Sequence, residues 1–172
     1  MRILIFFLSG IAICLTSGCS KAQDSLTDKN VLIVYLSRTN NTKAVAEIIQ
    51  SNLGGTIVSL ELEKPYPEDY QTTVKQVEKE NETGFLPALN TKIDSIEKYD
   101  VVFVGFPTWG MQLPPSVKSF LKNYDLGGKT VIPFNTHAGY GIGSSINVIR
   151  FSFITVTRCG GDGYWNFLRS VK

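Results

Sequence analysis

The residue types best suited to bind a ligand fall in three loops, and the first of these begins at Ser37. It comprises six consecutive residues that lead directly into a helical pattern: Ser37, Arg38, Thr39, Asn40, Asn41 and Thr42. Hydroxyl groups and free backbone amides at a helix N-terminus form a cradle for a phosphate, which the helix dipole also favours. The segment lacks Gly and a GK[ST] ending, so it is neither a Walker phosphate loop nor a dinucleotide fingerprint. The alternative is a plain polar helix cap.

The second loop runs from Pro107 to Pro115 and places an aromatic plate beside a flexible peptide. Its first four residues are Pro107, Thr108, Trp109 and Gly110. An indole can stack on a flat heteroaromatic ligand, and the backbone at a glycine can approach such a ligand closely and rotate. The alternative is that Trp109 folds over the core.

The third loop, residues 135–144, again combines glycines with an aromatic side chain. Its candidate ligand contacts are Asn135, Thr136, His137, Ala138 and Gly139. His137 is the only histidine of the chain; it could donate a proton or a hydrogen bond near pH 7, or it could be an ordinary solvated loop residue. One histidine without a cysteine pair does not predict a metal site.

Each of these loops follows a short apolar run of the kind that forms a strand buried on both faces. Four such runs are rich in Val, Ile and Phe and do not alternate with polar residues: Val31 to Leu36, Thr56 to Leu60, Val101 to Phe106 and Thr130 to Phe134. Strands that alternate with helices predict an α/β fold, a doubly wound parallel sheet with helices on both faces. Ligands of such sheets bind beyond the carboxyl ends of the strands, where these loops lie.

Helical patterns occupy the segments between the strands. They are Lys43 to Leu53, Asp69 to Glu80 and Pro115 to Tyr124. The first should bury one face and begin at Thr42 as its N-cap, with Gly54 as its stop; the residues expected on that face are Val45, Ile48, Ile49 and Leu53. The second should place Tyr70, Val74 and Val77 together.

Taken in order, the three loops resemble those of the flavodoxin family over residues 31 to about 149. The matching segments are the strand with Ser-Arg-Thr-x-Asn-Thr-Lys after it, Tyr99 to Gly110, and Phe134 to Ser144. The resemblance implies a flavodoxin-like sheet of about five strands that binds FMN non-covalently and transfers one or two electrons. It implies that Ser37, Thr39, Asn41 and Thr42 hold the phosphate near Arg38, that Trp109 and Gly110 contact the isoalloxazine, and that Thr136 to Gly139 line its pyrimidine side. Where the family commonly has Gly, this chain has Asn40, a residue that tolerates a positive φ.

The resemblance implies an electron carrier whose redox partner is a protein or a quinone, and which is a monomer. An NAD(P)H-dependent flavin or quinone reductase on the same fold is the alternative among enzymes, although the chain has no separate dinucleotide motif. A flavin-free, degenerate binding protein is the alternative from another class.

The C-terminal end departs from the family pattern. Residues 144–150 allow barely two helical turns before Phe151 to Thr157, which reads as a fifth strand, and residues 164–171 offer one short helix. We therefore expect a domain of residues 31–172 in which 150–172 is an atypical tail. Such a tail would be either a compact variant or the product of a frameshift or truncated gene.

The N-terminus has the pattern of a bacterial lipoprotein. Arg2 precedes an apolar run from Ile3 to Leu15, and small residues precede Cys19. We expect residues 1–18 to be a signal peptide, Cys19 to carry lipid and residues 19–30 to be a polar tether. The protein would then be exported and anchored to a membrane, facing the periplasm or the cell surface; an ordinary secretory signal is the alternative.

The composition of the chain further limits the classes of protein to which it can belong. The chain has 172 residues, of which 43% are hydrophobic, enough for one domain with a real core. Its formal net charge is +2, but residues 19–149 hold 12 basic against 14 acidic residues, with the two signs interspersed. A nucleic-acid surface would need clustered Lys and Arg, so binding of nucleic acid is not expected.

Overall fold

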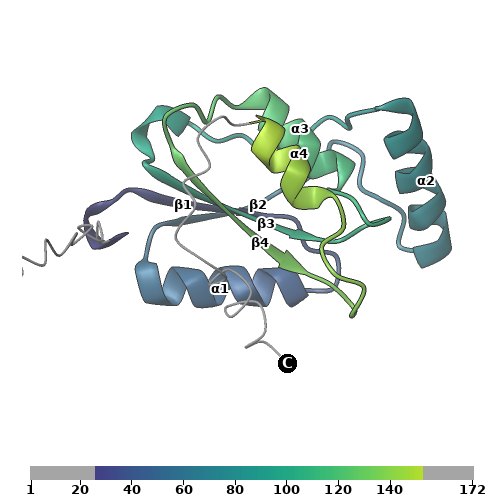
Figure 1. Cartoon of the computed structure of the whole chain (residues 1–172), viewed down its shortest axis with the longest axis horizontal. Helices are drawn as coiled ribbons and strands as arrows, with labels where there is room; N and C mark the ends of the chain where they lie inside the picture. Colours follow the sequence, from purple (N-terminus) through teal and green to yellow (C-terminus); the bar gives the residue numbers. More distant parts are fainter. Residues whose placement is uncertain (1–25, 153–172) are drawn as a thin grey trace, which may run out of the picture.

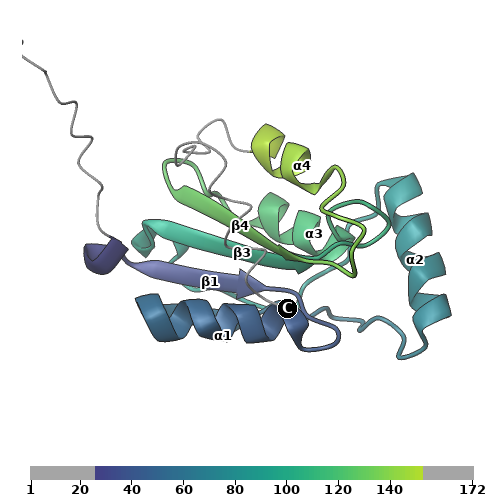
Figure 2. The same cartoon turned by 60° about the horizontal axis from the view of Figure 1, so that its bottom comes forward.

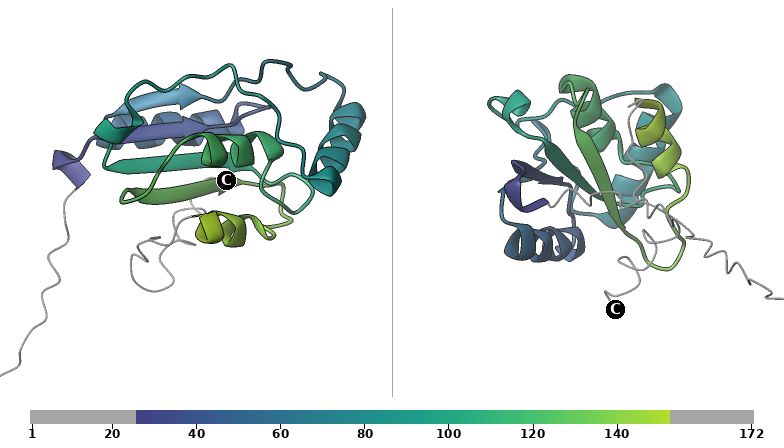
Figure 3. Two further views of the ribbon diagram at one scale, coloured as in Figure 1. Left: turned by 90° about the horizontal axis from the view of Figure 1, so that it is seen from above. Right: turned by 60° about the vertical axis from the view of Figure 1, so that its left-hand side comes forward.

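The computed structural model describes residues 26–152, which form one parallel four-stranded sheet between layers of helices (Figure 1). The strands are β1 (Val31–Tyr35), β2 (Thr56–Ser59), β3 (Val101–Pro107) and β4 (Thr130–Thr136). They lie in the order β2-β1-β3-β4, which Figure 3 shows from above. The flavodoxin-like parallel α/β fold predicted from the sequence is confirmed, and each strand lies within two residues of its predicted bounds.

The helices that cover the two faces of the sheet come from different parts of the chain. Helix α1 (Asn41–Leu53) packs on one face, while α3 (Pro115–Asn123) and α4 (Ser145–Ser152) lie on the other (Figures 1 and 2). Because side chains of a strand alternate between faces, Val31, Ile33 and Tyr35 pack toward α1, whereas Leu32 and Val34 pack toward α3. Within residues 26–152 there are also two short 3-10 turns, at Leu26–Asp28 and Ile96–Lys98.

Helix α1 buries a narrower face than the sequence predicts. Val45, Ala46 and Ile49 are buried against the sheet, but Ile48 and Leu53 are exposed by 47% and 38%. The prediction for those two side chains is therefore wrong, because a helix packed on a sheet buries only the strip of its surface that faces the sheet.

The N-cap of α1 also differs from the prediction. The cap is Asn40, with φ 62°, and not Thr42, which lies inside the first turn and is buried. The positive φ expected of Asn40 is confirmed, and Gly54 ends the helix as predicted.

Helix α2 (Tyr70–Thr83) is placed unlike the others, across the carboxyl ends of the strands (Figures 1 and 2). The Asp69 carboxylate caps it by accepting the amide of Thr72, and Gly84 ends it in the left-handed conformation. Its buried residues are Thr73, Val77 and Glu80, whereas Tyr70 and Val74 are exposed by 60% and 40%. The predicted apolar stripe therefore exists, but only Val77 of it is buried.

The predicted fifth strand is wrong at its first two residues, because Phe151 and Ser152 belong to α4. Once the helix has begun at Ser145 it continues through them without a helix breaker. The rest of that strand, the tail, the signal peptide and Cys19 lie outside the described residues. Within residues 26–152, no helix has the length and apolarity that a membrane span requires.

Candidate functional site

The three loops singled out by the sequence converge at the carboxyl edge of the sheet. They follow β1, β3 and β4, which are neighbours in the sheet. The register pairs Tyr35 with Gly105 and Pro107 with Thr136, so all three strands end at nearly the same level. The parallel topology thus brings together segments that are about 30 to 100 residues apart in the sequence.

The first loop is open at its tip and anchored at its base. The exposed residues of the tip are Thr39, Asn40 and Asn41. The side-chain amide of Asn41 donates to the Thr39 hydroxyl at 3.3 Å. The Ser37 hydroxyl accepts from the backbone amide of Lys43 at 3.3 Å. The loop therefore curls around the N-terminus of α1, whose first amides have no acceptor within the helix.

Thr42 joins the first loop to the third. It is only 2% exposed, and its hydroxyl lies 2.8 Å from the hydroxyl of Thr136 at the end of β4. This hydrogen bond between the two hydroxyl groups fixes the start of α1 beside β4.

Arg38 points away from the rest of its loop and toward α2. Its guanidinium donates to the backbone carbonyl of Glu68 at 2.7 Å and lies 5.5 Å from the ring centre of Tyr70. The side chain thus connects the first loop to the start of α2 through a hydrogen bond and a cation–π contact.

The second loop makes a tight turn that presents Trp109. Trp109 and Gln112 exchange backbone hydrogen bonds of 3.3 and 3.0 Å, and the two residues between them have positive φ, 56° at Gly110 and 58° at Met111. Two successive left-handed residues are the pattern of a type I′ turn. The left-handed conformation is unusual for Met111, which has a side chain.

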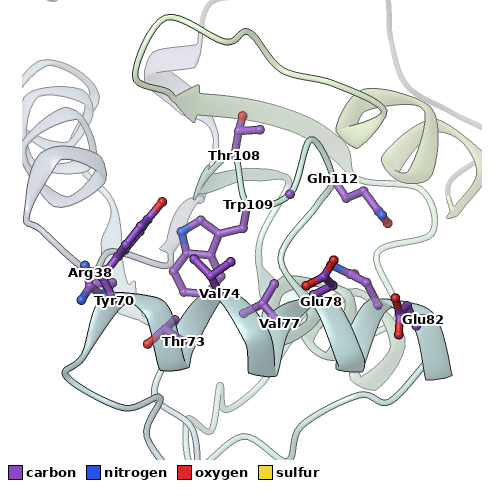
Figure 4. Close-up of a pocket in the computed structure, with 12 residues that line it drawn as sticks. Arg38, Tyr70, Thr73, Val74, Val77, Glu78, Glu82, Thr108, Trp109 and Gln112 are labelled. Atoms are coloured by element: carbon purple, nitrogen blue, oxygen red, sulfur yellow. The ribbon is translucent and has the colours of Figure 1, made fainter.

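Trp109 combines the two roles that the sequence left open. The indole is half-buried and packs against the buried side chains between the sheet and α3. It also meets the ring of Tyr66 edge to face, with the ring centres 5.2 Å apart. At the same time it lines a cavity of about 430 Å³ between the turn and α2 (Figure 4).

The cavity has an apolar wall and a charged rim. Tyr70, Val74 and Val77 of α2 form this wall, with Arg38 at one end of the cavity and Glu82 at the other. Of the predicted site residues, the cavity brings together Arg38, Thr108, Trp109 and Gly110. The other predicted residues lie nearby at the sheet edge but do not line it.

The start of the third loop is bonded to the second. Asn135 is buried, and its side-chain amide donates to the carbonyl of Phe106 and to the hydroxyl of Thr108, both at 3.0 Å. The Thr108 hydroxyl also lies 3.0 Å from the carbonyl oxygen of Gly141. Asn135 and Thr108 therefore crosslink the ends of β3 and β4.

The tip of the third loop is exposed and organised by its histidine. His137, Ala138 and Gly139 are exposed, and Nδ1 of His137 accepts the amides of Gly139 and Gly141 at 3.1 and 3.2 Å. With Nδ1 acting as an acceptor, the neutral imidazole carries its proton on Nε2. Further along, the amide of Ser144 donates to the Met111 carbonyl at 3.0 Å, which ties this loop to the Trp109 turn.

Sequence reasoning predicted the helix α2 but missed its part in the site, and it missed the residues behind Trp109. Tyr66, which precedes α2, donates a hydrogen bond to Glu80 at 2.7 Å. Burial, and then this carboxylate, raise the pKa of the Tyr66 phenol well above its usual range. Desolvation lowers the pKa of Lys118 on α3, whose ammonium donates to Asn81. The only signal for this part of the site was the apolar spacing of Tyr70, Val74 and Val77.

These features define a class of protein: a parallel α/β domain in which the loops after the strands form a site with an exposed helix N-terminus, an indole and glycines of positive φ. Sequence comparison gives the family. The flavodoxin family profile matches residues 30–162. The chain belongs to the flavodoxin family, as the sequence motifs predicted.

Solved structures of similar proteins agree with this assignment. A candidate flavoprotein of Bacteroides eggerthii is 32% identical, with a TM-score of 0.67, over 73% of this chain and 81% of that one. A second, from Bacteroides uniformis, is 23% identical, with a TM-score of 0.67, over 83% and 97%. A flavoprotein of Lactobacillus acidophilus in complex with FMN shares the fold at 24% identity and a TM-score of 0.63, over 72% and 85%. No match was found among curated proteins.

Proposed function

We propose that this protein binds FMN non-covalently at the carboxyl edge of the sheet and transfers electrons. The observation that carries the proposal is the convergence of the three predicted loops around β1, β3 and β4, with Trp109 lining a cavity beside them. Membership of the flavodoxin family supports it.

The first loop fits a phosphate. Its exposed tip offers the Thr39 hydroxyl, the Asn41 amide and the free amides of the first turn of α1, and the dipole of this 13-residue helix favours an anion there. Ser37 shapes the loop by its bond to the amide of Lys43. The hydroxyl of Thr42 pairs with Thr136, so in this arrangement Thr42 supports the loop and contributes its backbone.

The second and third loops fit a flat ring system. A Cβ added to Gly110 or Gly139 would meet no atom within 4 Å, so there is open space beside both backbones. Trp109 offers its indole for stacking, and His137, at the exposed tip of the third loop, can donate from Nε2. FMN, when bound, supplies the one- or two-electron chemistry, and the protein supplies position and electrostatics.

The turn at Gly110 and Met111 can also reorient a hydrogen-bonding group. Rotation of the peptide between them converts a type I′ turn into type II′, which keeps the positive φ of Gly110 and releases Met111 from the left-handed region. The same rotation reverses the direction of the Gly110 carbonyl and the Met111 amide. We propose that this peptide adjusts its hydrogen bond to the flavin when the flavin is reduced.

Reconstitution tests the function. Protein lacking the signal peptide is mixed with FMN, separated from free flavin and reduced stepwise while its visible absorption is recorded. The proposal expects a yellow complex that accepts electrons reversibly, and a Trp109→Ala variant with weaker binding and altered potentials. The absence of a flavin band in the purified complex would overturn it. Direct oxidation of NADPH by the holoprotein would favour a reductase over an electron carrier.

We also propose that the protein is exported and held at a membrane by lipid on Cys19. The support is the apolar run from Ile3 to Leu15 that ends in small residues before Cys19. Intact mass spectrometry of protein extracted from bacterial membranes should find a mature N-terminus at Cys19 with attached acyl chains. A soluble product cleaved elsewhere, or membrane binding unchanged by Cys19→Ala, would contradict this.

A further inference from the structure

A chain of contacts behind Trp109 connects the two walls of the cavity. The ring of Tyr66 meets the indole at 85°, with 5.2 Å between the ring centres. The Tyr66 hydroxyl then donates to Oε2 of Glu80 at 2.7 Å, and Glu80 belongs to α2, which forms the opposite wall. Neither Tyr66 nor Glu80 lines the cavity itself.

Glu80 is an unusual residue to find in this place. It is only 6% exposed, and its other carboxylate oxygen accepts from the side-chain amide of Gln76 at 2.8 Å. Within the described residues the one ion pair joins Lys43 and Glu47, so Glu80 has hydrogen-bond donors and no countercharge. A buried carboxylate is costly unless it is hydrogen-bonded, and the donors therefore fix its position strongly.

The direction of the hydrogen bond is also fixed. The raised pKa of Tyr66 keeps its phenol protonated, so the phenol acts as the donor and Glu80 as the acceptor. The ring of Tyr66 is thereby held at its far end by α2 and presents one orientation to Trp109. Without that ring, the indole on its tight turn would lose a lateral contact that restricts its rotation.

We propose that Tyr66 and Glu80 are positioning residues of the flavin site: they fix the plane of Trp109 and the separation between the indole and α2. This inference rests on the proposed function. The cavity supports it, because Trp109 and α2 are its two walls and the Tyr66–Glu80 bond spans them from behind. Loosening the pair should weaken flavin binding and raise the reduction potential of the flavin. The reason is that an indole that stacks poorly on the flavin destabilises its anionic reduced form less than a well-stacked indole does.

The test isolates Trp109 as a spectroscopic probe. The chain has two tryptophans, so a Trp165→Phe background leaves Trp109 alone. Near-ultraviolet circular dichroism of the apoprotein then reports the packing of its indole, and FMN titration and potentiometry follow on the same samples. The variants are Tyr66→Leu, which removes the ring, Tyr66→Phe, which removes only the hydroxyl, and Glu80→Gln, which can still accept from Tyr66.

Tyr124→Phe is the matched control. Tyr124 lies at the end of α3, and its hydroxyl accepts the backbone amide of Ile93 at 2.9 Å, so it also joins a helix to a loop by one hydrogen bond. Unlike Trp109, it does not line the cavity. The control should lose stability and keep the Trp109 signal and the potential.

We expect Tyr66→Leu to lose most of the Trp109 dichroism and roughly two- to tenfold in FMN affinity, the range that one aromatic pair supplies. Tyr66→Phe should show a smaller loss, and Glu80→Gln should retain the dichroism. Unchanged dichroism and potential in Tyr66→Leu would overturn the inference, as would equal changes in Tyr124→Phe. If the parent protein binds no FMN, the proposed function fails, while the dichroism of the apoprotein still decides whether Tyr66 positions Trp109.

Discussion

Gly143 is the residue at which the third loop touches the turn that carries Trp109. Its φ is +58°, and a Cβ added there would lie 2.0 Å from the Met111 carbonyl oxygen. The next residue, Ser144, donates its amide to that same oxygen at 3.0 Å. A Gly143→Ala substitution should therefore strain its own backbone and push the two loops apart.

The expected magnitude is the sum of two costs. A left-handed φ costs a residue with a Cβ roughly 1–2 kcal/mol. Overpacking against backbone, which cannot rotate aside as a side chain would, costs about 1–3 kcal/mol more. Gly143→Ala should thus lower the free energy of unfolding by about 2–5 kcal/mol.

Gly84→Ala separates the two costs. Gly84 has φ +68° at the end of α2, but nothing lies within 4 Å of an added Cβ, so only the backbone cost applies. Urea unfolding followed by far-ultraviolet circular dichroism gives both free energies, and FMN titration shows whether the Trp109 turn has moved. If Gly143→Ala is no more destabilising than Gly84→Ala and binds FMN as the parent does, the close packing of these two loops is refuted.

Three further substitutions test other contacts. Thr42→Val should lower the free energy of unfolding by about 1 kcal/mol, because it leaves the Thr136 hydroxyl without its partner; if Thr42→Val and Thr136→Val prove fully additive in urea unfolding, the pair does not interact. Ser145→Ala should raise that free energy by up to about 1 kcal/mol, since the Ser145 hydroxyl is buried without a hydrogen-bond partner, and a loss in urea unfolding would show an unrecognised bond. Hydrogen bonds from the Thr72 hydroxyl and amide lower the pKa of Asp69, so the stability from this cap is present above its ordinary pKa near 4 and is lost as pH falls through the lowered pKa. The melting temperature of the parent should therefore fall more than that of Asp69→Asn on acidification below about pH 4, and parallel curves would exclude the cap as the cause.

The parts of this fold that follow from local sequence were predictable. Val, Ile and Phe runs without alternation gave the strands of a parallel sheet, and Gly54 and Pro115 marked helix ends through their backbone preferences. The positive φ of Asn40 was likewise predictable, because a family glycine is replaced there by the residue that best tolerates that conformation. The convergence of the loops at the carboxyl edge of the sheet then followed from the parallel topology.

The parts that depend on tertiary packing were not predictable. The apolar spacing of α2 indicates a helix with one apolar stripe, but cannot say that the stripe faces a cavity at the end of the sheet. The buried Glu80 has the residue type of a solvated helix face, and its partner Tyr66 lies in a loop 14 residues earlier with no motif to mark it. For the same reason the prediction of Thr42 as a helix cap is wrong, because its hydroxyl is hydrogen-bonded to that of Thr136, which lies in a strand 94 residues away.

The central claim is that the edge formed by β1, β3 and β4 binds FMN, and thermal unfolding with and without FMN tests it most directly. A ligand that binds only the folded protein adds about 2.7 kcal/mol of stability at a hundredfold excess over its dissociation constant. We predict that FMN raises the melting temperature of the protein in a concentration-dependent way, and raises that of Trp109→Ala less at equal concentration. A melting temperature that does not change with FMN would contradict the claim.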